Sequence, residues 1–240
     1  MTKTVFITGG SKRLGQAVTK ALHHRGWNIA LHYGQSKAAA ISLADTLNAQ
    51  RPESVQCYQA DLSNDESLEA MLTNIEIDYP SLDAIVNNAA VFAPSFEGRT
   101  SRSQWDQIFA VNLKAPFFIC QRLNHCLTEA SSIINICDVF GRRPLKDFTA
   151  YSASKAGLIM LTRSLALELA PKTRVNGIAP GALLPPELQG DSELLSEVLT
   201  QTPLGTLGGV SGFVQTLLFI LHQPNMTGQI IPIDGGLSIN

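Results

Sequence analysis

A tyrosine and a lysine four residues apart carry the clearest chemical signal in the sequence. Tyr151 and Lys155 open a stretch from 151 to 169 that has helical spacing of apolar residues and no internal proline. Positions i and i+4 share one face of a helix, so we expect the Lys155 ammonium group to lower the pKa of the Tyr151 phenol from its usual value of about 10. The pair predicts a proton donor that works near neutral pH. Ordinary packing on a helix face is the alternative for the pair alone.

A glycine-rich turn, TGGSKRLG at 8–15, follows an apolar run at 5–7 and opens a helix. Glycines allow a tight turn and close backbone approach, and the N–H groups at a helix N-terminus can bind a pyrophosphate. The turn therefore predicts a dinucleotide site. A turn that only connects strand and helix is the alternative, because this motif alone is a weak signal.

Short apolar runs alternate along the chain with longer stretches of helical period, which is typical of repeated βαβ units. The expected strands are 5–7, 28–33, 55–60, 84–86, 133–136, 174–178 and 230–233, and the expected helices are 14–24, 36–50, 105–127 and 151–169. Nearly continuous apolar strands imply a parallel sheet with helices on both faces, and ligands of such sheets bind at the carboxyl ends of the strands.

We therefore expect one doubly wound, Rossmann-type α/β domain over residues 1–240. Its cofactor half should span about 1–135, and its catalytic and substrate half about 136–240. The stretch at 181–209 is rich in Pro, Gly and Leu and follows a predicted strand end. We interpret it as a mobile lid over the substrate, made of a loop and a helix.

Composition excludes several classes of partner. Eighteen basic and 20 acidic residues give a formal net charge of -2, which argues against nucleic acid or an anionic membrane as a partner. The four cysteines show no CxxC or Cys/His spacing, so neither a disulfide framework nor a metal site is expected. The chain starts without a secretion signal, and no apolar run approaches the roughly 18 residues of a membrane span. We expect a soluble, cytoplasmic protein.

Four motifs occur in a characteristic order across nearly the whole chain: the glycine turn, Asn-Asn-Ala at 87–89, Tyr-Ser-Ala-Ser-Lys at 151–155 and Asp-Gly-Gly at 234–236. Together they resemble the short-chain dehydrogenase/reductase family. The resemblance implies that Lys155 also holds the nicotinamide ribose and that Asn112 supports a proton relay to it. It further implies a homotetramer assembled through the helices expected at 105–127 and 151–169.

Asp138 departs from the family pattern. Most members carry a serine 13 residues before the tyrosine, and this serine hydrogen-bonds a substrate carbonyl; here the position holds Asp138. An ionised carboxylate cannot donate a hydrogen bond and repels a developing oxyanion, so simple ketone reduction is disfavoured. A carboxyl group suits ring nitrogens instead, since it can accept N–H bonds or relay a proton to an imine nitrogen. The substrate chemistry that fits is a pterin.

Segments at 12–15, 31–33, 47–52, 59–64 and 162–171 resemble the pteridine reductase branch of the family. That resemblance implies that Arg13 reaches the pterin and the phosphates, that Phe92 stacks on the ring, and that Asp138, Tyr151 and Lys155 deliver the proton. The alternatives are a core aromatic for Phe92 and a capped turn for Asp138.

The cofactor is predicted from the residues after the second strand. NAD-preferring relatives place an acid there, whereas YGQSK at 33–37 has none, which favours NADPH. The pteridine reductases carry His-Arg-Ser where this chain has Gly-Gln-Ser, so Lys12, Ser36 and Lys37 would replace the missing cation, with Arg13 nearby. The predicted cofactor-binding residues are Gly9, Ser11, Lys12, Arg13, Leu14, Tyr33, Gln35, Ser36, Lys37, Asp61, Leu62, Asn88, Ala89, Lys155, Pro180 and Gly181.

The function that follows is NADPH-dependent reduction of dihydropterins, and also of oxidised pterins and dihydrofolate, to tetrahydro forms. One alternative is a carbonyl reductase acting on a 3-oxoacyl thioester or a sugar-type substrate. A second is an NADP-binding sensor without turnover, against which the set of Tyr151, Lys155 and Asn112 argues.

Overall fold

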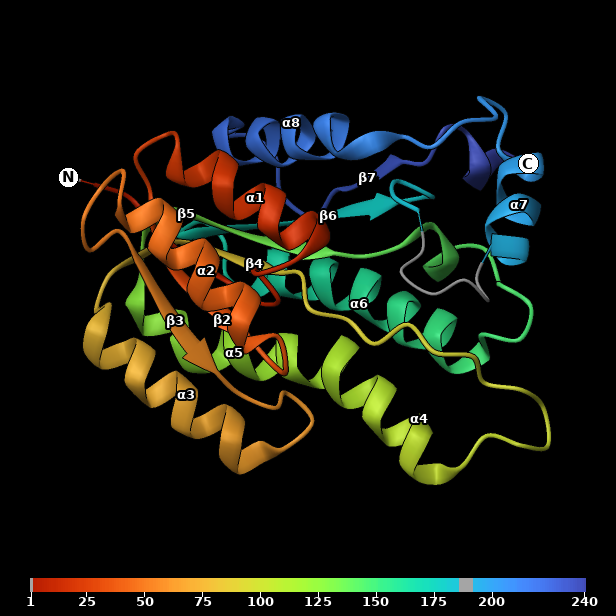
Figure 1. The fold of residues 1–240 in the computed structure, drawn as a ribbon, viewed down its shortest axis with the longest axis horizontal. Coiled ribbons are helices and arrows are strands. Elements are labelled where there is room, and N and C mark those ends of the chain that lie inside the picture. The colour runs from red at the N-terminus through yellow and green to blue at the C-terminus, as the bar shows by residue number, and fades with distance from the viewer. Residues whose placement is uncertain (1, 186–191) are drawn as a thin grey trace.

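Seven parallel strands form one sheet in the order β3-β2-β1-β4-β5-β6-β7 (Figure 1). A computed structural model of the chain describes residues 2–185 and 192–240. The strands are β1 (Thr4–Ile7), β2 (Asn28–Tyr33), β3 (Val55–Gln59), β4 (Leu82–Asn87), β5 (Leu127–Ile136), β6 (Thr173–Pro180) and β7 (Ile230–Ile233). The prediction of a doubly wound parallel sheet is confirmed.

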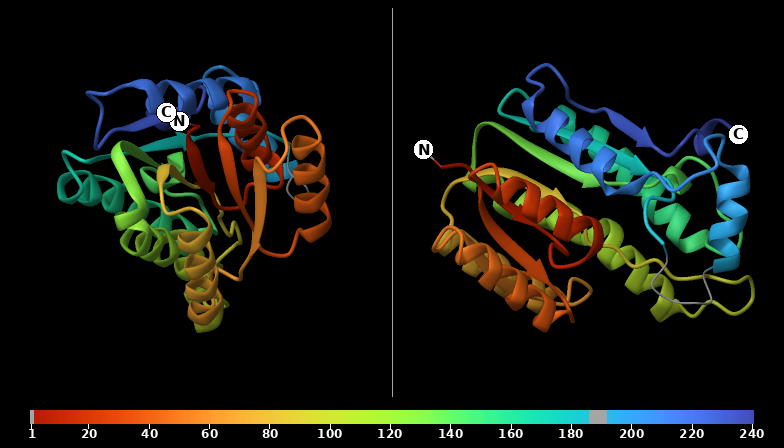
Figure 2. Two further views of the ribbon diagram at one scale, coloured as in Figure 1. Left: turned by 90° about the vertical axis from the view of Figure 1, so that its left-hand side faces the viewer. Right: turned by 45° about the horizontal axis from the view of Figure 1, so that its top comes forward.

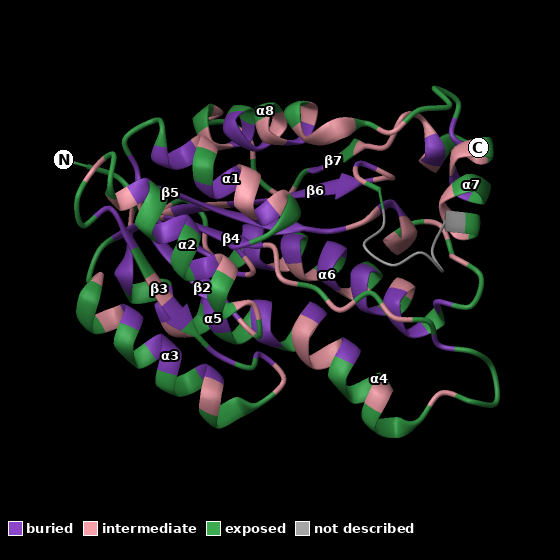
Figure 3. Cartoon of the chain, in the orientation of Figure 1, coloured by how far each residue is buried: buried purple, intermediate pink, exposed green. Residues whose placement is uncertain are grey.

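Helices cover both faces of the sheet. They are α1 (Arg13–His23), α2 (Lys37–Asn48), α3 (Asp65–Asp78), α4 (Arg102–Phe109), α5 (Ala115–Leu123), α6 (Thr149–Glu168), α7 (Ser192–Gln201) and α8 (Gly209–His222). The helices α1, α2 and α8 lie on one face of the sheet, and α3, α5 and α6 lie on the other (Figure 2). Apolar side chains of each set form a buried cluster against the strands. The inner strands β1, β2, β4 and β6 are almost wholly buried (Figure 3), as their continuous apolar runs predict. The edge strands β3 and β7 are partly exposed.

Two helices were not anticipated from the sequence, α3 and α8. In α3 the signals are present: Asn64 caps the helix by accepting a hydrogen bond from the Ser67 N–H at 2.8 Å, and Leu68, Leu72 and Ile75 follow at helical spacing. Leu72 and Ile75 are fully buried, and such burial contributes about 1.5–3 kcal/mol per side chain.

The helix expected at 105–127 is corrected to two helices joined by a π-helical turn. α4 ends at Phe109, the π turn covers Ala110–Lys114, and α5 runs to Leu123. Pro116 explains the interruption, because proline has no N–H to donate to the carbonyl of Asn112 and its ring collides with that carbonyl in an α-helix. The Ala115 N–H bonds the carbonyl of Ala110, five residues back.

The strand order reverses between β1 and β4, which lie side by side at the centre of the sheet. From β1 the chain winds outward through β2 to β3, and it then returns to β4 and winds the other way to β7. Such a switch point leaves a crevice at the carboxyl ends of the strands. The glycine turn, Asn88 and Asp138 all follow strand ends at this edge.

Candidate active site

The glycine turn is built for close backbone approach. Gly9 has a positive φ of 62°, and a Cβ on Gly15 would lie 2.1 Å from the carbonyl oxygen of Gly9. The Asn88 side-chain amide donates to the carbonyls of Thr8 and Gly9 at 2.9 and 3.0 Å, and the Thr8 hydroxyl accepts from the N–H groups of Asn88 and Ala89 at 2.9 and 3.0 Å. The predicted residues Gly9, Asn88 and Ala89 therefore form one unit.

A buried histidine, His32, is hydrogen-bonded to the glycine turn. His32 Nδ1 accepts from the Gly9 N–H at 3.1 Å, and its Nε2 lies 3.1 Å from the carbonyl of Ala60. Because Nδ1 is the acceptor, Nε2 carries the proton and donates. Burial lowers the pKa of His32 to about 4, although the Ala60 carbonyl raises it. The ring is therefore neutral, and sequence reasoning did not assign it a role.

Three cations surround the turn. Lys12, Arg13 and Lys37 are all exposed, and no side chain caps the N-terminus of α1. The Ser11 and Ser36 hydroxyls are hydrogen-bonded at 2.7 Å, which joins the turn to the start of α2. An uncapped helix N-terminus beside exposed cations fits an anionic dinucleotide with a further phosphate.

The side chains of Tyr33 and Leu62 do not face this site. Tyr33 is 5% exposed and packs in the cluster with α1 and α2, and Leu62 is 6% exposed in the opposite cluster. Leu14 is half-buried against the first of these clusters, whereas Gln35 is exposed. Any contact that Tyr33 or Leu62 makes with a cofactor must therefore come from the backbone.

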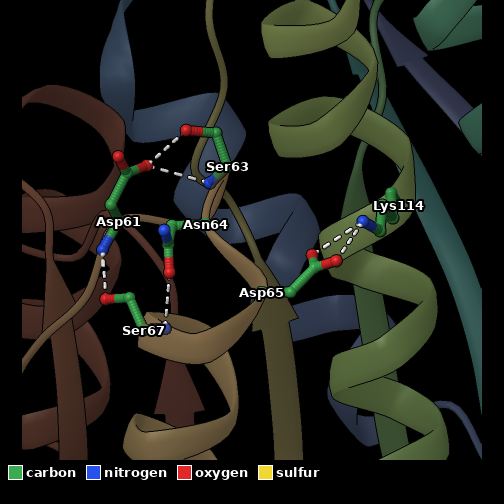
Figure 4. Close-up of polar contacts among 6 residues, drawn as sticks. All are labelled: Asp61, Ser63, Asn64, Asp65, Ser67 and Lys114. Carbon is green, nitrogen blue, oxygen red and sulfur yellow. Dashed lines mark hydrogen bonds and ion pairs between the residues drawn. The ribbon is translucent and has the colours of Figure 1, made fainter.

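Asp61 lies in a hydrogen-bonded turn after β3 (Figure 4). Its Oδ1 accepts from the N–H and hydroxyl of Ser63 at 2.9 and 2.6 Å, and these bonds lower the pKa of the carboxyl. Asp61 is not the N-cap of the following helix, because Asn64 caps α3. Asp61 is exposed and ionised, so its carboxylate can accept a hydrogen bond from an adenine amine.

The beginning of α3 is tied to the end of the π turn. Lys114 Nζ lies 2.6 and 2.7 Å from the two carboxylate oxygens of Asp65 (Figure 4). Both side chains are largely exposed, so this ion pair adds little stability.

The residues of the candidate catalytic centre include a hydrogen-bonded pair, Tyr151 and Asp138. The Tyr151 hydroxyl donates to Asp138 Oδ2 at 2.6 Å, and the Phe140 N–H donates to Oδ1 at 2.9 Å. Burial and the neighbouring carboxylate raise the pKa of Tyr151 well above its usual value. The expectation that Lys155 lowers this pKa is therefore wrong for the structure, because the nearest charge to the phenol is a carboxylate.

Lys155 lies beside the pair without bonding the phenol. Its ammonium group donates to the carbonyl of Ile136 at 2.8 Å and is 5.8 Å from the centre of the Tyr151 ring. Burial lowers the pKa of Lys155, and Asp138 acts in the opposite direction. Burial also raises the pKa of Asp138, against the hydrogen bonds from Tyr151 and Phe140 and the charge of Lys155. A carboxyl group with a raised pKa can hold and release a proton closer to neutral pH.

The Asn112 side chain is fully engaged. It accepts from the Val91 N–H at 2.8 Å and donates to the Val91 carbonyl and the Ser154 hydroxyl, each at 3.0 Å. These bonds join the π turn, the loop after β4 and α6. If Asn112 supports a proton relay, as the family resemblance implies, its backbone carbonyl is the available group, since Pro116 cannot bond it.

Phe92 lies beside the candidate catalytic centre and is 47% exposed, so the alternative of a core aromatic is wrong. Its ring stacks on Phe148 at 4.4 Å between centroids and meets the ring of Tyr151 edge-on at 4.8 Å. The structure thus brings Phe92, Asp138 and Tyr151 together as the sequence predicts. Phe148 was missed, because only the tertiary contact reveals it.

The segment after β6 approaches the glycine turn. Arg13 donates to the carbonyl of Pro185 at 3.0 Å. The Gly181 N–H donates to the carbonyl of Ile233 at 2.9 Å, and a Cβ on Gly181 would lie 2.9 Å from Asp234 Cα, so only glycine fits there. Part of the predicted lid, residues 186–191, lies outside the described residues.

Two further features bear on possible partners. No helix in the described ranges combines the length and the apolar character needed to cross a bilayer. Within 2–185 and 192–240, no three His, Cys, Asp or Glu side chains gather in a way that could hold a metal ion.

Comparison with known proteins gives relatives that match nearly the full chain. A family model described as enoyl-(acyl carrier protein) reductase matches residues 10–238. The 3-oxoacyl-[acyl-carrier-protein] reductase FabG of Staphylococcus aureus is 32% identical and covers 99% of this chain and 98% of its own length. Pteridine reductase 1 of Leishmania tarentolae is 33% identical, with 98% of this chain and 96% of the relative covered.

Solved structures agree with this placement. The FolM alternative dihydrofolate reductase 1 from Brucella canis, complexed with NADP, is similar with a TM-score of 0.89 and 30% identity over 99% of this chain and 95% of that one. A blue fluorescent protein from a metagenomic library, in complex with NADPH, has a TM-score of 0.92 and 26% identity over 98% of both chains. With the fold, the motifs and these matches in agreement, the chain belongs to the short-chain dehydrogenase/reductase family of oxidoreductases.

Proposed function

We propose that this protein reduces the carbon–nitrogen double bond of dihydropterins to tetrahydropterins with NADPH. The observation that carries the proposal is the hydrogen bond between the Tyr151 hydroxyl and Asp138, 2.6 Å long, beside the exposed ring of Phe92. An aromatic platform next to an acid pair suits a flat heterocycle whose ring nitrogen must be protonated.

Each residue of the site has a separate role in the proposed reduction. Bound NADPH supplies a hydride to the carbon of the double bond, and the nitrogen takes a proton from the protein. Tyr151 holds that proton at its hydroxyl, and Asp138, whose pKa is raised, replaces it. Phe92 orients the ring by stacking, and the buried ammonium group of Lys155, beside Tyr151, would bind the ribose of the cofactor. The balance is one hydride and one proton for each double bond reduced.

The choice of NADPH rests on charge. The end of β2 offers Ser36 and Lys37 and no acid, and Lys12 and Arg13 are exposed nearby. Charge-assisted hydrogen bonds from such groups favour a ribose phosphate over ribose hydroxyls. The FolM structure and the blue fluorescent protein hold NADP and NADPH respectively, which supports the same choice for this chain.

Relatives support two substrate classes. Pteridine reductase 1 and the FolM protein favour a pterin or a folate, whereas the FabG relatives favour a 3-oxoacyl thioester. Asp138 decides between them in our proposal, because a carboxylate bonded to Tyr151 would repel the oxyanion that forms when a carbonyl is reduced.

We also propose that the chain assembles as a homotetramer. Large apolar side chains remain exposed on α4, α5 and α6, which are the helices expected to form interfaces. They are Trp105, Phe117, Phe118, Met160 and Leu167. Exposed apolar residues gathered on neighbouring helices are typical of an interface between subunits.

The test is a substrate panel in which the loss of NADPH absorbance is followed with dihydrobiopterin, dihydromonapterin, dihydrofolate and an acetoacetyl thioester, and repeated with NADH. We expect the highest kcat/KM for a dihydropterin with NADPH. A preference for the thioester would make the protein a 3-oxoacyl reductase, and absence of turnover with every substrate would favour the sensor.

A further inference from the structure

The catalytic helix α6 lacks a cap of its own. Its N-cap position is Phe148, whose side chain makes no capping bond. The first N–H groups of a helix have no partner within the helix and are usually satisfied by a Ser, Thr, Asp or Asn at that position. Tyr151 is the third residue of α6, so the missing cap falls beside the proposed proton donor.

Ser95 supplies the cap from another part of the chain. Its hydroxyl accepts a hydrogen bond from the N–H of Ala150, the second residue of α6, at 2.9 Å. This is the N–H that a local capping side chain would bond. Ser95 is 6% exposed, so no water competes readily for the bond.

The backbone of Ser95 is fixed at the same place. Its N–H donates to the carbonyl of Asp147 at 2.6 Å, and Ser95 forms a parallel bridge with Phe148. Asp147 has a φ of 65°, in the left-handed region that few residue types other than Gly, Asn and Asp adopt readily. Ser95 therefore holds both the turn before α6 and the first turn of α6.

Ser95 also belongs to the loop that carries Phe92. Phe92 lies three residues before Ser95, and Tyr151 lies three residues after Phe148. The bridge between Ser95 and Phe148 thus sets the two short segments side by side, and the rings of Phe92, Phe148 and Tyr151 meet across it. A shift of one segment along the other would separate the aromatic platform from the acid.

We propose that Ser95 is a positioning residue: its hydroxyl caps α6 and so aligns the Tyr151 hydroxyl with a substrate held against Phe92. The inference rests on the proposed role of Tyr151 as proton donor, and it does not depend on whether the substrate is a pterin or a thioester. Misplacement of a reacting group by about 1 Å can cost about 100-fold in rate.

The test compares Ser95→Val with Ser95→Thr, two β-branched residues of nearly equal size that differ in the hydroxyl. Rates are measured at saturating NADPH with the substrate that the unmodified protein turns over best. A wrong substrate assignment then appears already in the substrate panel of the unmodified protein, and it does not affect the comparison between the Ser95 variants. We expect Ser95→Val to lower kcat by about tenfold or more, with the NADPH dissociation constant unchanged by fluorescence titration. Ser95→Thr should retain most of the turnover, because it keeps the acceptor.

Two measurements separate positioning from general damage. Hydrogen exchange at the Ala150 amide should quicken in Ser95→Val and stay slow in Ser95→Thr. Ser101→Ala is the matched control. The Ser101 hydroxyl caps α4 by accepting from the Gln104 N–H at 3.1 Å, and the loss of this cap should leave kcat unchanged. Equal turnover in the Val and Thr variants, whether normal or lost, or a matching loss of NADPH binding in Ser95→Val, would overturn the proposal.

Discussion

The cofactor end and the substrate end of the crevice are held by different means. At the cofactor end, the side chains of Asn88 and His32 are hydrogen-bonded to the backbone of Thr8 and Gly9, and the Thr8 hydroxyl accepts from the Asn88 N–H. The neighbouring strands are buried. At the substrate end, Asp138 and the exposed Phe92 lie on loops and meet Tyr151 through side chains.

This difference indicates where the chain can vary. A site defined by backbone shape requires small residues and buried polar partners, so few substitutions preserve it. A site defined by side chains on loops can change its substrate through single substitutions while the fold persists. We therefore assign cofactor binding to the backbone-defined cofactor end and substrate choice to the substrate end.

The largest effect should come from Tyr151→Phe, which removes the proton donor and leaves the ring contacts of Phe92 in place. We expect turnover to fall by about 100- to 10,000-fold, with NADPH affinity within a few fold of the unmodified value. Steady-state kinetics and a fluorescence titration with NADPH measure the two quantities. Near-normal turnover would remove Tyr151 from the mechanism and leave the substrate end without an acid.

Gly15→Ala tests the backbone-defined region. The new Cβ would lie 2.1 Å from the Gly9 carbonyl oxygen and 2.7 Å from Asn88 Nδ2, so the turn must shift. Overpacking of this kind costs about 1–3 kcal/mol, and we expect the NADPH dissociation constant to rise by about 100-fold at the upper end of that range. Gly212→Ala is the control, because no atom lies within 4 Å of its Cβ position. Unchanged affinity in Gly15→Ala would contradict the close approach.

The sequence predicts the strands and the motif residues because apolar runs and local spacing determine them. It does not predict the partners that the fold brings to those motifs from distant segments. His32 reads as one residue of a buried strand, and Ser95 and Phe148 meet only in three dimensions. The pKa of Tyr151 was predicted in the wrong direction because helical spacing places Lys155 nearby, whereas the carboxylate of Asp138 comes from another element.

A smaller effect is expected from the neutral His32 behind the glycine turn. Its pKa is about 4 in the folded chain against 6.5 for an ordinary histidine. The unfolded chain therefore takes up the proton first, and stability falls as the pH is lowered from 6.5 towards 4. The loss should be about 2 kcal/mol between pH 7 and pH 5.

Urea unfolding at those two pH values measures this loss. In His32→Asn, whose new side chain cannot titrate, the free energy of unfolding should depend less steeply on pH. The pH dependence that remains would include a contribution from His23, whose pKa burial also lowers. An unaltered slope in His32→Asn would mean that His32 does not hold the turn as a neutral ring.

The proposed role of Asp138 in making this chain a pterin reductase is tested by Asp138→Ser. We would measure kcat/KM for dihydrobiopterin and for a small diketone on both proteins, after confirming equal melting temperatures. We predict that kcat/KM for dihydrobiopterin falls by at least about tenfold. The kcat/KM for the diketone should hold or rise, because the substrate oxygen gains a donor and loses a nearby negative charge. Unchanged pterin activity in Asp138→Ser would contradict this role.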